Sequence, residues 1–141
     1  MAKTPEWWPM LFAAWLIAMV ATLSALFIGE VMGQTPCLLC WYQRIAMFPL
    51  AVILGVACLV EDQRAWRYAA PLGGAGFLVA VWHNLLYFKI VPQAIEPCGA
   101  GPSCSSAAMT ILGRVPIPAL SLLAFVLILA LLWLARRKAH S

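Results

Sequence analysis

Four long apolar stretches, separated by short polar segments, dominate the hydropathy pattern of the chain. They cover about residues 10–29, 41–60, 68–88 and 118–135. Each comes close to the roughly 20 residues that a helix needs to cross a hydrocarbon core about 30 Å thick. Because backbone that faces lipid must satisfy its own hydrogen bonds, the pattern predicts an all-α membrane protein. We expect a four-transmembrane-helix bundle that forms one domain over residues 1–141.

Composition supports a membrane environment rather than water. Apolar residues make up 65% of the chain and charged residues 10%, whereas a soluble domain averages roughly 45–50% and about 25%. The first stretch is longer than the roughly 7–15 apolar residues of a signal peptide, and no small-x-small cleavage pattern follows it. We therefore expect residues 10–29 to remain as a membrane-spanning helix.

The distribution of basic residues predicts how the bundle is oriented. One side of a four-span protein would hold six of the nine Lys and Arg residues: Lys3, Arg64, Arg67, Arg136, Arg137 and Lys138. The other side would hold the remaining three: Arg44, Lys89 and Arg114. The positive-inside rule then places both termini in the cytoplasm and the loops at about residues 31–40 and 89–117 outside. The net charge of +4 is explained by this orientation, and we expect no nucleic-acid partner.

Four of the five cysteines fall in the two outward loops. Cys37 and Cys40 form a CxxC motif, and Cys98 and Cys104 belong to the stretch CGAGPSC. Cys58 lies within the second span, as a small core residue would. Disulfides persist on the oxidising side of the membrane, so the four loop cysteines are compatible with redox exchange, structural disulfides or a Cys₄ metal site. The five residues between Cys98 and Cys104 exceed the two to four of a typical zinc knuckle, and we expect no metal.

The stretch TPCLLCWYQR favours redox exchange. We expect the second helix to begin near Cys37, with Pro36 as an opening residue. Cys37, Cys40 and Arg44 then share one face of the helix, within about 60° of one another. A helix N-terminus and a nearby guanidinium both stabilise a thiolate and make it a better attacking or leaving group. A purely structural disulfide needs neither.

Two ionisable residues inside the spans are further candidates. An arginine at mid-span costs roughly 2.5–3.5 kcal/mol, and less near the interface. Arg44 therefore either snorkels to the headgroups or faces inward and holds an anionic group. His83 lies on the outward half of the third span, where a lone histidine is either buried and bonded to its own helix or part of a site. The two side chains could meet at similar depth.

These features together resemble a known family. The block PCLLCWYQR, a histidine late in the third span and a cysteine pair in the second outward loop are similar to the DsbB family of bacterial disulfide bond formation proteins, which are membrane thiol:quinone oxidoreductases. The likeness covers nearly the whole chain. CGAGPSC followed by ILGRVPIPALSLLAF resembles the short-loop, BdbC-like branch, whereas better-known members have a longer gap between these cysteines. Many members also carry a glutamine where this chain has Tyr87.

The resemblance implies a function. The chain would reoxidise a soluble thioredoxin-like dithiol carrier of the DsbA kind and pass the electrons to a membrane quinone, ubiquinone or menaquinone. It would thereby support disulfide formation in exported proteins. Its location would be the bacterial cytoplasmic (inner) membrane, with the redox cysteines on the extracytoplasmic side.

The resemblance also implies a role for each site residue. Cys37 and Cys40 would be the pair beside the quinone, with Cys40 engaging the quinone ring, and Arg44 and His83 would bind the quinone. The shuttle pair would be Cys98, which forms a mixed disulfide with the carrier, and Cys104, which exchanges with Cys37.

Two other classes of protein compete with this interpretation. A non-catalytic membrane scaffold could use the same cysteines to staple its loops with disulfides. A haem-binding quinone subunit is disfavoured, because His83 is the one histidine within the predicted spans and bis-His ligation needs a second.

Overall fold

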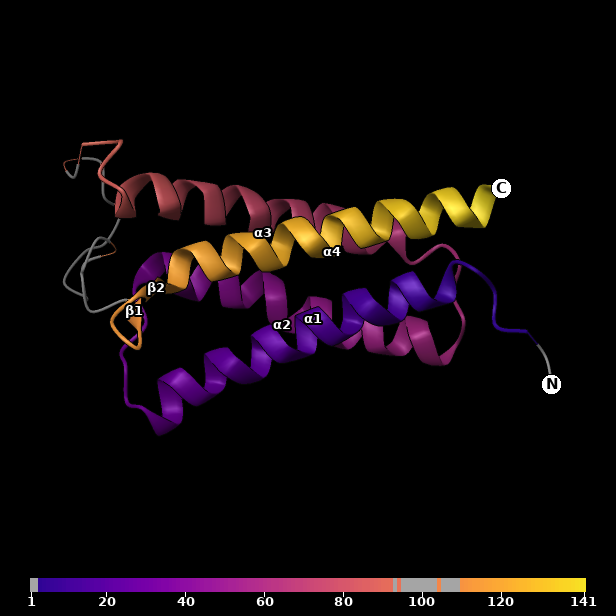
Figure 1. Cartoon of the computed structure of the whole chain (residues 1–141), viewed down its shortest axis with the longest axis horizontal. Helices are drawn as coiled ribbons and strands as arrows, with labels where there is room; N and C mark the ends of the chain where they lie inside the picture. Colours follow the sequence, from indigo (N-terminus) through magenta and orange to yellow (C-terminus); the bar gives the residue numbers. More distant parts are fainter. Residues whose placement is uncertain (1–2, 93, 95–103, 105–109) are drawn as a thin grey trace.

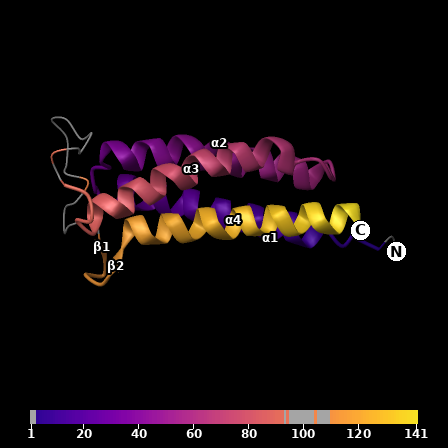
Figure 2. The same cartoon turned by 90° about the horizontal axis from the view of Figure 1, so that it is seen from above.

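The computed structural model describes residues 3–92, 94, 104 and 110–141. Four long helices run side by side as a bundle (Figures 1 and 2). They are α1 (Trp8–Leu26), which continues into the short π-helix η1 (Phe27–Val31), α2 (Leu38–Leu59), α3 (Trp66–Tyr87) and α4 (Ile117–His140). A short antiparallel hairpin, β1 (Thr110–Ile111) and β2 (Val115–Pro116), leads into α4.

Each of the four helices is long and apolar enough to cross a membrane. The spans are Trp8–Val31, Leu38–Leu59, Trp66–Tyr87 and Ile117–His140, and they contain 24, 22, 22 and 24 residues. The predicted four-helix membrane bundle is thus confirmed. All four helices extend beyond the predicted apolar stretch at one end or both, because helical hydrogen bonding does not stop where the apolar run ends. α2 begins at Leu38, and α4 continues through its basic residues to His140.

The chain ends lie together at one end of the bundle (Figure 1). There, Lys138 Nζ lies 2.9 Å from Glu6 Oε2, and Gln63 Nε2 donates to the carbonyl oxygen of Ala139 at 2.6 Å. The hairpin and the α1–α2 connection lie at the opposite end, which also holds the first turns of α2 and α4 (Figure 1). The cysteine chemistry is therefore concentrated at the end away from the termini.

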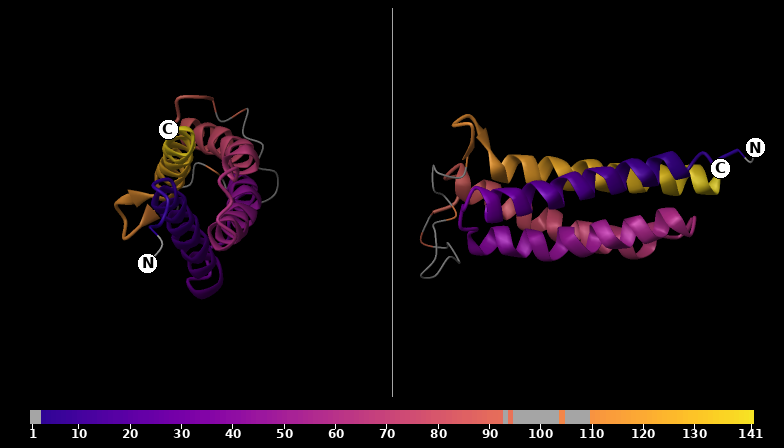
Figure 3. Two further views of the ribbon diagram at one scale, coloured as in Figure 1. Left: turned by 90° about the vertical axis from the view of Figure 1, so that its right-hand side faces the viewer. Right: turned by 90° about the horizontal axis from the view of Figure 1, so that it is seen from below.

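Each helix packs against two neighbours, so that α1, α2, α3 and α4 form a closed ring (Figure 3). The main core consists of buried apolar side chains such as Leu50, Leu54 and Phe125. Small residues let the helices approach closely, as is common in membranes. At Gly76 in α3, an added Cβ would overlap the ring of Phe125 and lie 3.0 Å from the Cβ of Ala46. The α3–α4 interface therefore requires glycine at this position.

Candidate functional site

The CxxC cysteines lie at the start of α2. Cys37 is the N-cap residue, with φ −71° and ψ 170°, and its Sγ accepts a hydrogen bond from the backbone N–H of Cys40 at 3.4 Å. Pro36 therefore precedes the cap instead of opening the helix, because the Cys37 thiol satisfies a free N–H of the first turn. The two sulfurs lie 3.0 Å apart, and both thiols are free. The helix thus holds the pair in contact as a dithiol.

The contact between the sulfurs affects the acidity of Cys37, which lies just outside the α2 span. The hydrogen bond from Cys40 is the largest influence and lowers the pKa of the Cys37 thiol to about 5. Burial opposes this change, whereas a hydrogen bond from His83 and the backbone N–H of Cys40 reinforce it. With a pKa well below 7, Cys37 is a thiolate at neutral pH, the form that attacks disulfides.

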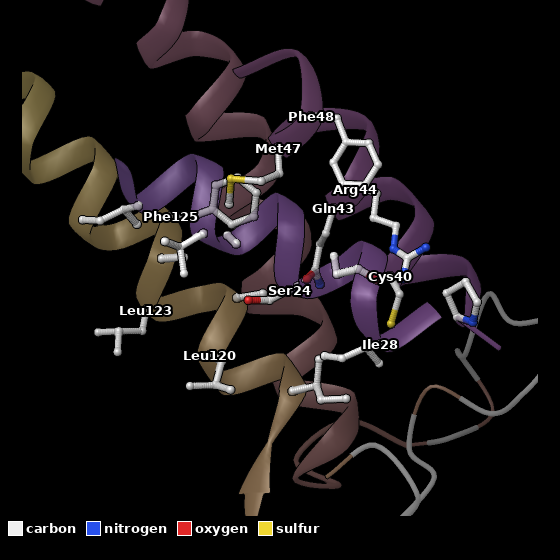
Figure 4. A pocket seen from close by; sticks show the side chains of 18 of the residues that line it. Ser24, Ile28, Cys40, Gln43, Arg44, Met47, Phe48, Leu120, Leu123 and Phe125 are labelled. Carbon is white, nitrogen blue, oxygen red and sulfur yellow. Dashed lines mark hydrogen bonds between the residues drawn. The ribbon is translucent and has the colours of Figure 1, made fainter. Parts of the chain in front are cut away.

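A cavity of about 510 Å³ opens between α1, α2 and α4 at this end of the bundle. Cys40, Gln43 and Arg44 project into it from α2 (Figure 4). Most of its remaining wall is apolar and comes from α1, η1 and α4, including Leu16, Val20, Ile28, Leu120, Leu123, Phe125 and Leu127. The cavity is therefore largely apolar, with a small polar region beside one sulfur.

Arg44 is held at the polar region by α1. Its Nη2 donates to the carbonyl oxygen of Ala25 at 2.7 Å, and its guanidinium lies 5.5 Å from the ring centre of Trp41. Gly29 in η1 makes room for it, since an added Cβ would lie 2.9 Å from Nη2. A guanidinium has five N–H donors, and the hydrogen bond to Ala25 uses one. Arg44 therefore faces inward, as one of the two predicted alternatives requires.

His83 occupies a different place from Arg44. It is 1% exposed and is not among the residues that line the cavity. Its Nε2 lies 3.8 Å from Cys37 Sγ, and its Nδ1 lies 2.9 Å from Gln43 Nε2. The structure brings both ionisable residues to the CxxC pair, but Arg44 lies on the Cys40 side and His83 on the Cys37 side.

Sequence reasoning missed two polar residues that connect these groups. Gln43 is 7% exposed, and its Oε1 accepts a hydrogen bond from Ser121 of α4. Both residues also line the cavity. A weak signal was available for Gln43, because a buried amide between two functional positions of an apolar helix needs a partner. Ser121 carries no such signal, since its pairing depends on how α4 packs.

The second outward loop contributes Cys104. This residue is disulfide-bonded and fully buried, and it packs in a small apolar cluster with Cys37, Leu39 and Leu86, separate from the main core. Its predicted partner, Cys98, lies outside the described residues. Cys58, by contrast, carries a free thiol within the main core. The CxxC pair thus has the cavity on one side and Cys104 on the other.

Comparison with known proteins identifies the family. The family model described as Disulfide bond formation protein DsbB matches residues 6–135. The chain belongs to the DsbB family. With four candidate membrane spans, it is accordingly an inner-membrane protein, and family membership implies oxidoreductase activity in disulfide bond formation.

Relatives of the same family match nearly the whole chain. A probable disulfide formation protein of Metapseudomonas resinovorans is 57% identical over 132 residues, 93% of this chain and 92% of the relative. Disulfide bond formation protein C of Bacillus subtilis is 37% identical, covering 89% of this chain and 91% of the relative. A probable disulfide formation protein of Deinococcus radiodurans is 42% identical, covering 91% and 89%. No solved structure matches the chain significantly.

The geometry of the DsbB-family site also bears on metal binding. Ligand atoms of Cys37, Cys40 and His83 lie within 4.8 Å of one another, a set that could hold an ion. Two thiolates on a tetrahedral zinc, each at about 2.3 Å, would lie about 3.8 Å apart. The observed separation of 3.0 Å is shorter and suits a hydrogen-bonded dithiol. The arrangement therefore favours thiol redox chemistry over metal binding.

Proposed function

We propose that this protein transfers electrons from a soluble thioredoxin-like dithiol carrier to a membrane quinone through two cysteine pairs. The observation that carries the proposal is the position of the CxxC sulfurs. They lie 3.0 Å apart, yet Cys40 lines the cavity while Cys37 packs in the cluster that contains Cys104. A dithiol that faces an apolar cavity on one side and a disulfide-bonded cysteine on the other is suited to pass electrons between them.

Two thiol–disulfide exchanges would connect the carrier to this pair. The carrier dithiol first reduces the disulfide that we assign to Cys98 and Cys104, through a mixed disulfide at Cys98, and becomes oxidised. The resulting dithiol then reduces a Cys37–Cys40 disulfide, with Cys104 and Cys37 as the exchanging sulfurs. Each exchange breaks one S–S bond, forms another, and moves two electrons and two protons. A Cys37–Cys40 dithiol, the state seen in the structure, remains at the end of the second exchange.

The cavity fits a quinone. Its volume of about 510 Å³ falls within the range of small-molecule sites. Its wall suits an isoprenoid tail along α1 and α4 and a polar ring beside Cys40, Gln43 and Arg44. A bound ubiquinone or menaquinone would supply an acceptor for the two electrons and two protons of the Cys37–Cys40 dithiol.

The residues around the pair would assist in distinct ways. Arg44, fixed by Ala25 and Gly29, would direct its remaining N–H groups at a quinone oxygen. His83 would act from the other side, on the sulfur of Cys37 rather than on the quinone itself. We therefore assign Arg44 to quinone binding and His83 to the thiol pair that serves it.

The energetics of the proposed direction are consistent with a quinone acceptor. A DsbA-like carrier is a strong oxidant, with a reduction potential of about −120 mV, so its reoxidation needs a stronger acceptor. For two electrons, about 30 mV corresponds to about 1.4 kcal/mol. A lipid-soluble quinone meets this need within the bilayer that surrounds α1 and α4.

Replacement of the CxxC cysteines separates this function from a scaffold with stapled loops. Cys37→Ala or Cys40→Ala should cause the carrier to accumulate in its reduced form in cells, whereas Cys58→Ala, a control on the same helix, should not. The redox state of the carrier is measured by trapping its thiols with a maleimide of high mass. Normal carrier oxidation in both CxxC variants would reject the proposed function.

A further inference from the structure

A line of hydrogen bonds, partly buried at Ser121 and buried at His83, runs from the cavity to the sulfur of Cys37. Ser121 Oγ donates to Gln43 Oε1. Gln43 Nε2 lies 2.9 Å from His83 Nδ1, and His83 Nε2 lies 3.8 Å from Cys37 Sγ. Gln43, His83 and Cys37 are 7%, 1% and 0% exposed. Three helices contribute to this line, which links a cavity-lining residue of α4 to the reactive thiol.

The chemistry of the groups gives the line a direction. An amide oxygen only accepts hydrogen bonds and an amide nitrogen only donates them. Because Gln43 Oε1 accepts from Ser121, its Nε2 faces the imidazole, and His83 Nδ1 must be the acceptor. A neutral imidazole that accepts at Nδ1 carries its proton on Nε2. His83 Nε2–H then donates to Cys37 Sγ, so every donor in the line points toward the sulfur.

The carbonyl oxygen of Pro118 favours this direction over its reverse. In the reverse arrangement the Gln43 amide would be flipped, and Ser121 would donate to Pro118 O instead. That carbonyl already accepts from Asn84 Nδ2 at 2.8 Å, and its distance from Ser121 Oγ is 3.2 Å. The Ser121 hydroxyl has one proton and lies closer to Gln43 Oε1 than to this carbonyl, which Asn84 already uses, so Gln43 Oε1 is the better partner for the hydroxyl.

We propose that Gln43 and Ser121 are positioning residues that fix His83 in its Nε2–H tautomer and thereby give Cys37 Sγ a fixed hydrogen-bond donor. Neither residue touches the sulfur. Their effect passes through the imidazole, whose other nitrogen determines which tautomer forms. The inference rests on the proposed function in that it assigns the thiolate a role, but the tautomer itself exists without carrier or quinone.

Nitrogen NMR of the protein labelled with ¹⁵N-histidine tests the inference directly. The chain has two histidines, His83 and His140, so a His140→Gln variant assigns the signals. In the reduced protein at neutral pH, the His83 proton should reside on Nε2, and Nδ1 should show the shift of an unprotonated nitrogen. A proton on Nδ1 in the wild-type protein would overturn the inference, whatever the variants do.

Variants test whether Gln43 and Ser121 cause the tautomer. Gln43→Met and Ser121→Ala should give a mixture of the two tautomers, and Ser121→Thr, which keeps the hydroxyl, should restore Nε2–H. Ser24→Ala is the matched control, because Ser24 lines the same cavity outside the line of hydrogen bonds, and it should leave the tautomer unchanged. A pure Nε2–H tautomer in both Gln43→Met and Ser121→Ala would contradict the inference.

A second readout follows the thiolate. Alkylation of Cys37 in the reduced protein, measured by peptide mass spectrometry near the midpoint of its titration, should be about threefold slower in Gln43→Met than in the wild type. Failure of the proposed function looks different: reduced carrier would not transfer electrons to quinone in the wild type, while His83 kept its Nε2–H tautomer. An Nδ1–H tautomer with normal turnover would remove the inference and leave the function intact.

Discussion

At the scale of single residues, the behaviour of the site depends on Cys37. Its position as N-cap of α2 turns its sulfur back onto the first turn, where Cys40 contacts it from one side and His83 from the other. Capping by a thiol is uncommon, since Ser, Thr, Asp and Asn are preferred. The sulfur therefore combines two tasks, because the contacts that satisfy the helix terminus also stabilise the thiolate.

The acidity of Cys37 gives a prediction on pH. Since its pKa is lowered to about 5, the thiolate should persist at neutral pH and disappear as the pH falls through about 5. In the reduced protein, the pH dependence of iodoacetamide labelling of Cys37 should have its midpoint near this value rather than near the ordinary thiol pKa of about 8.5. Cys40→Ala should raise the midpoint more than His83→Gln, because the Cys40 contact is the larger cause. A midpoint of about 8 in the wild type would refute the assignment.

Arg44 gives a second prediction at this scale. Arg44→Met should raise the apparent KM for quinone about tenfold or more, because a hydrogen bond to a charged group contributes about 1.5–3 kcal/mol. The four loop cysteines should still form their disulfides. Arg67→Met, which removes a guanidinium at the start of α3, is the control and should leave the KM unchanged. Steady-state quinone reduction by purified protein measures both, and an unaltered KM in Arg44→Met would exclude its role.

At the scale of the elements, α1 changes its winding where it meets Arg44. The helix passes into the π-helix η1 at Phe27, and the guanidinium contacts this region at Ala25 and Gly29. Single π-turns are frequent at functional sites. Here the change of winding coincides with the carbonyl and the glycine that hold Arg44, so α1 positions a side chain that belongs to α2.

A substitution in η1 tests this arrangement. The Cβ of Gly29→Ala would lie 2.9 Å from Arg44 Nη2 and 3.3 Å from Nη1, so the guanidinium must shift by a few tenths of an ångström. We expect the apparent KM for quinone to rise up to about tenfold, with little loss of thermal stability. Gly74→Ala in α3 is the matched control, since its Cβ meets open space. Equal KM values for the two variants would show that α1 does not position Arg44.

Spacing along one helix was predictable, and pairing between helices was not. Hydropathy predicted the four spans, and the 100° periodicity correctly grouped Cys40 with Arg44, since both line the cavity. Cys37 does not share this face, because it is the extended N-cap residue and packs in the cluster with Cys104. The sequence did not predict that Cys37 caps the second helix while Pro36 precedes the cap, or that His83 pairs with Gln43. Both features depend on side-chain contacts that hydropathy does not encode. Ser121 lies 78 positions from Gln43, and only the packing of α4 brings them together.

At the scale of the whole molecule, the site lies at one end of the bundle and the termini at the other (Figure 1). The basic residues concentrate near the termini, where Arg136 and Arg137 stack over Trp66 and Trp133 at 4.3 and 4.2 Å. The positive-inside rule assigns this end to the cytoplasm. The thiol pair would then lie at the outer surface, within reach of a soluble carrier.

Labelling of added cysteines tests this orientation. Leu112 at the hairpin is 93% exposed, and Ser141 is the exposed C-terminal residue. A membrane-impermeant maleimide added to intact spheroplasts should label Leu112→Cys, whereas Ser141→Cys should be labelled only after lysis. Mass analysis of the modified peptides separates these positions from the native cysteines. The opposite pattern would invert the topology and place the thiols in the cytoplasm.

The most direct test of electron transfer is anaerobic turnover with purified components. A reduced DsbA-like carrier and a ubiquinone analogue are mixed with the protein in lipid nanodiscs, and carrier thiols and reduced quinone are measured together. If the protein couples the two reactions, one carrier dithiol should be lost rapidly for each quinone reduced, and this activity should be absent in Cys40→Ala. Carrier oxidation without quinone reduction, or a rate no higher than that without protein, would contradict this coupling.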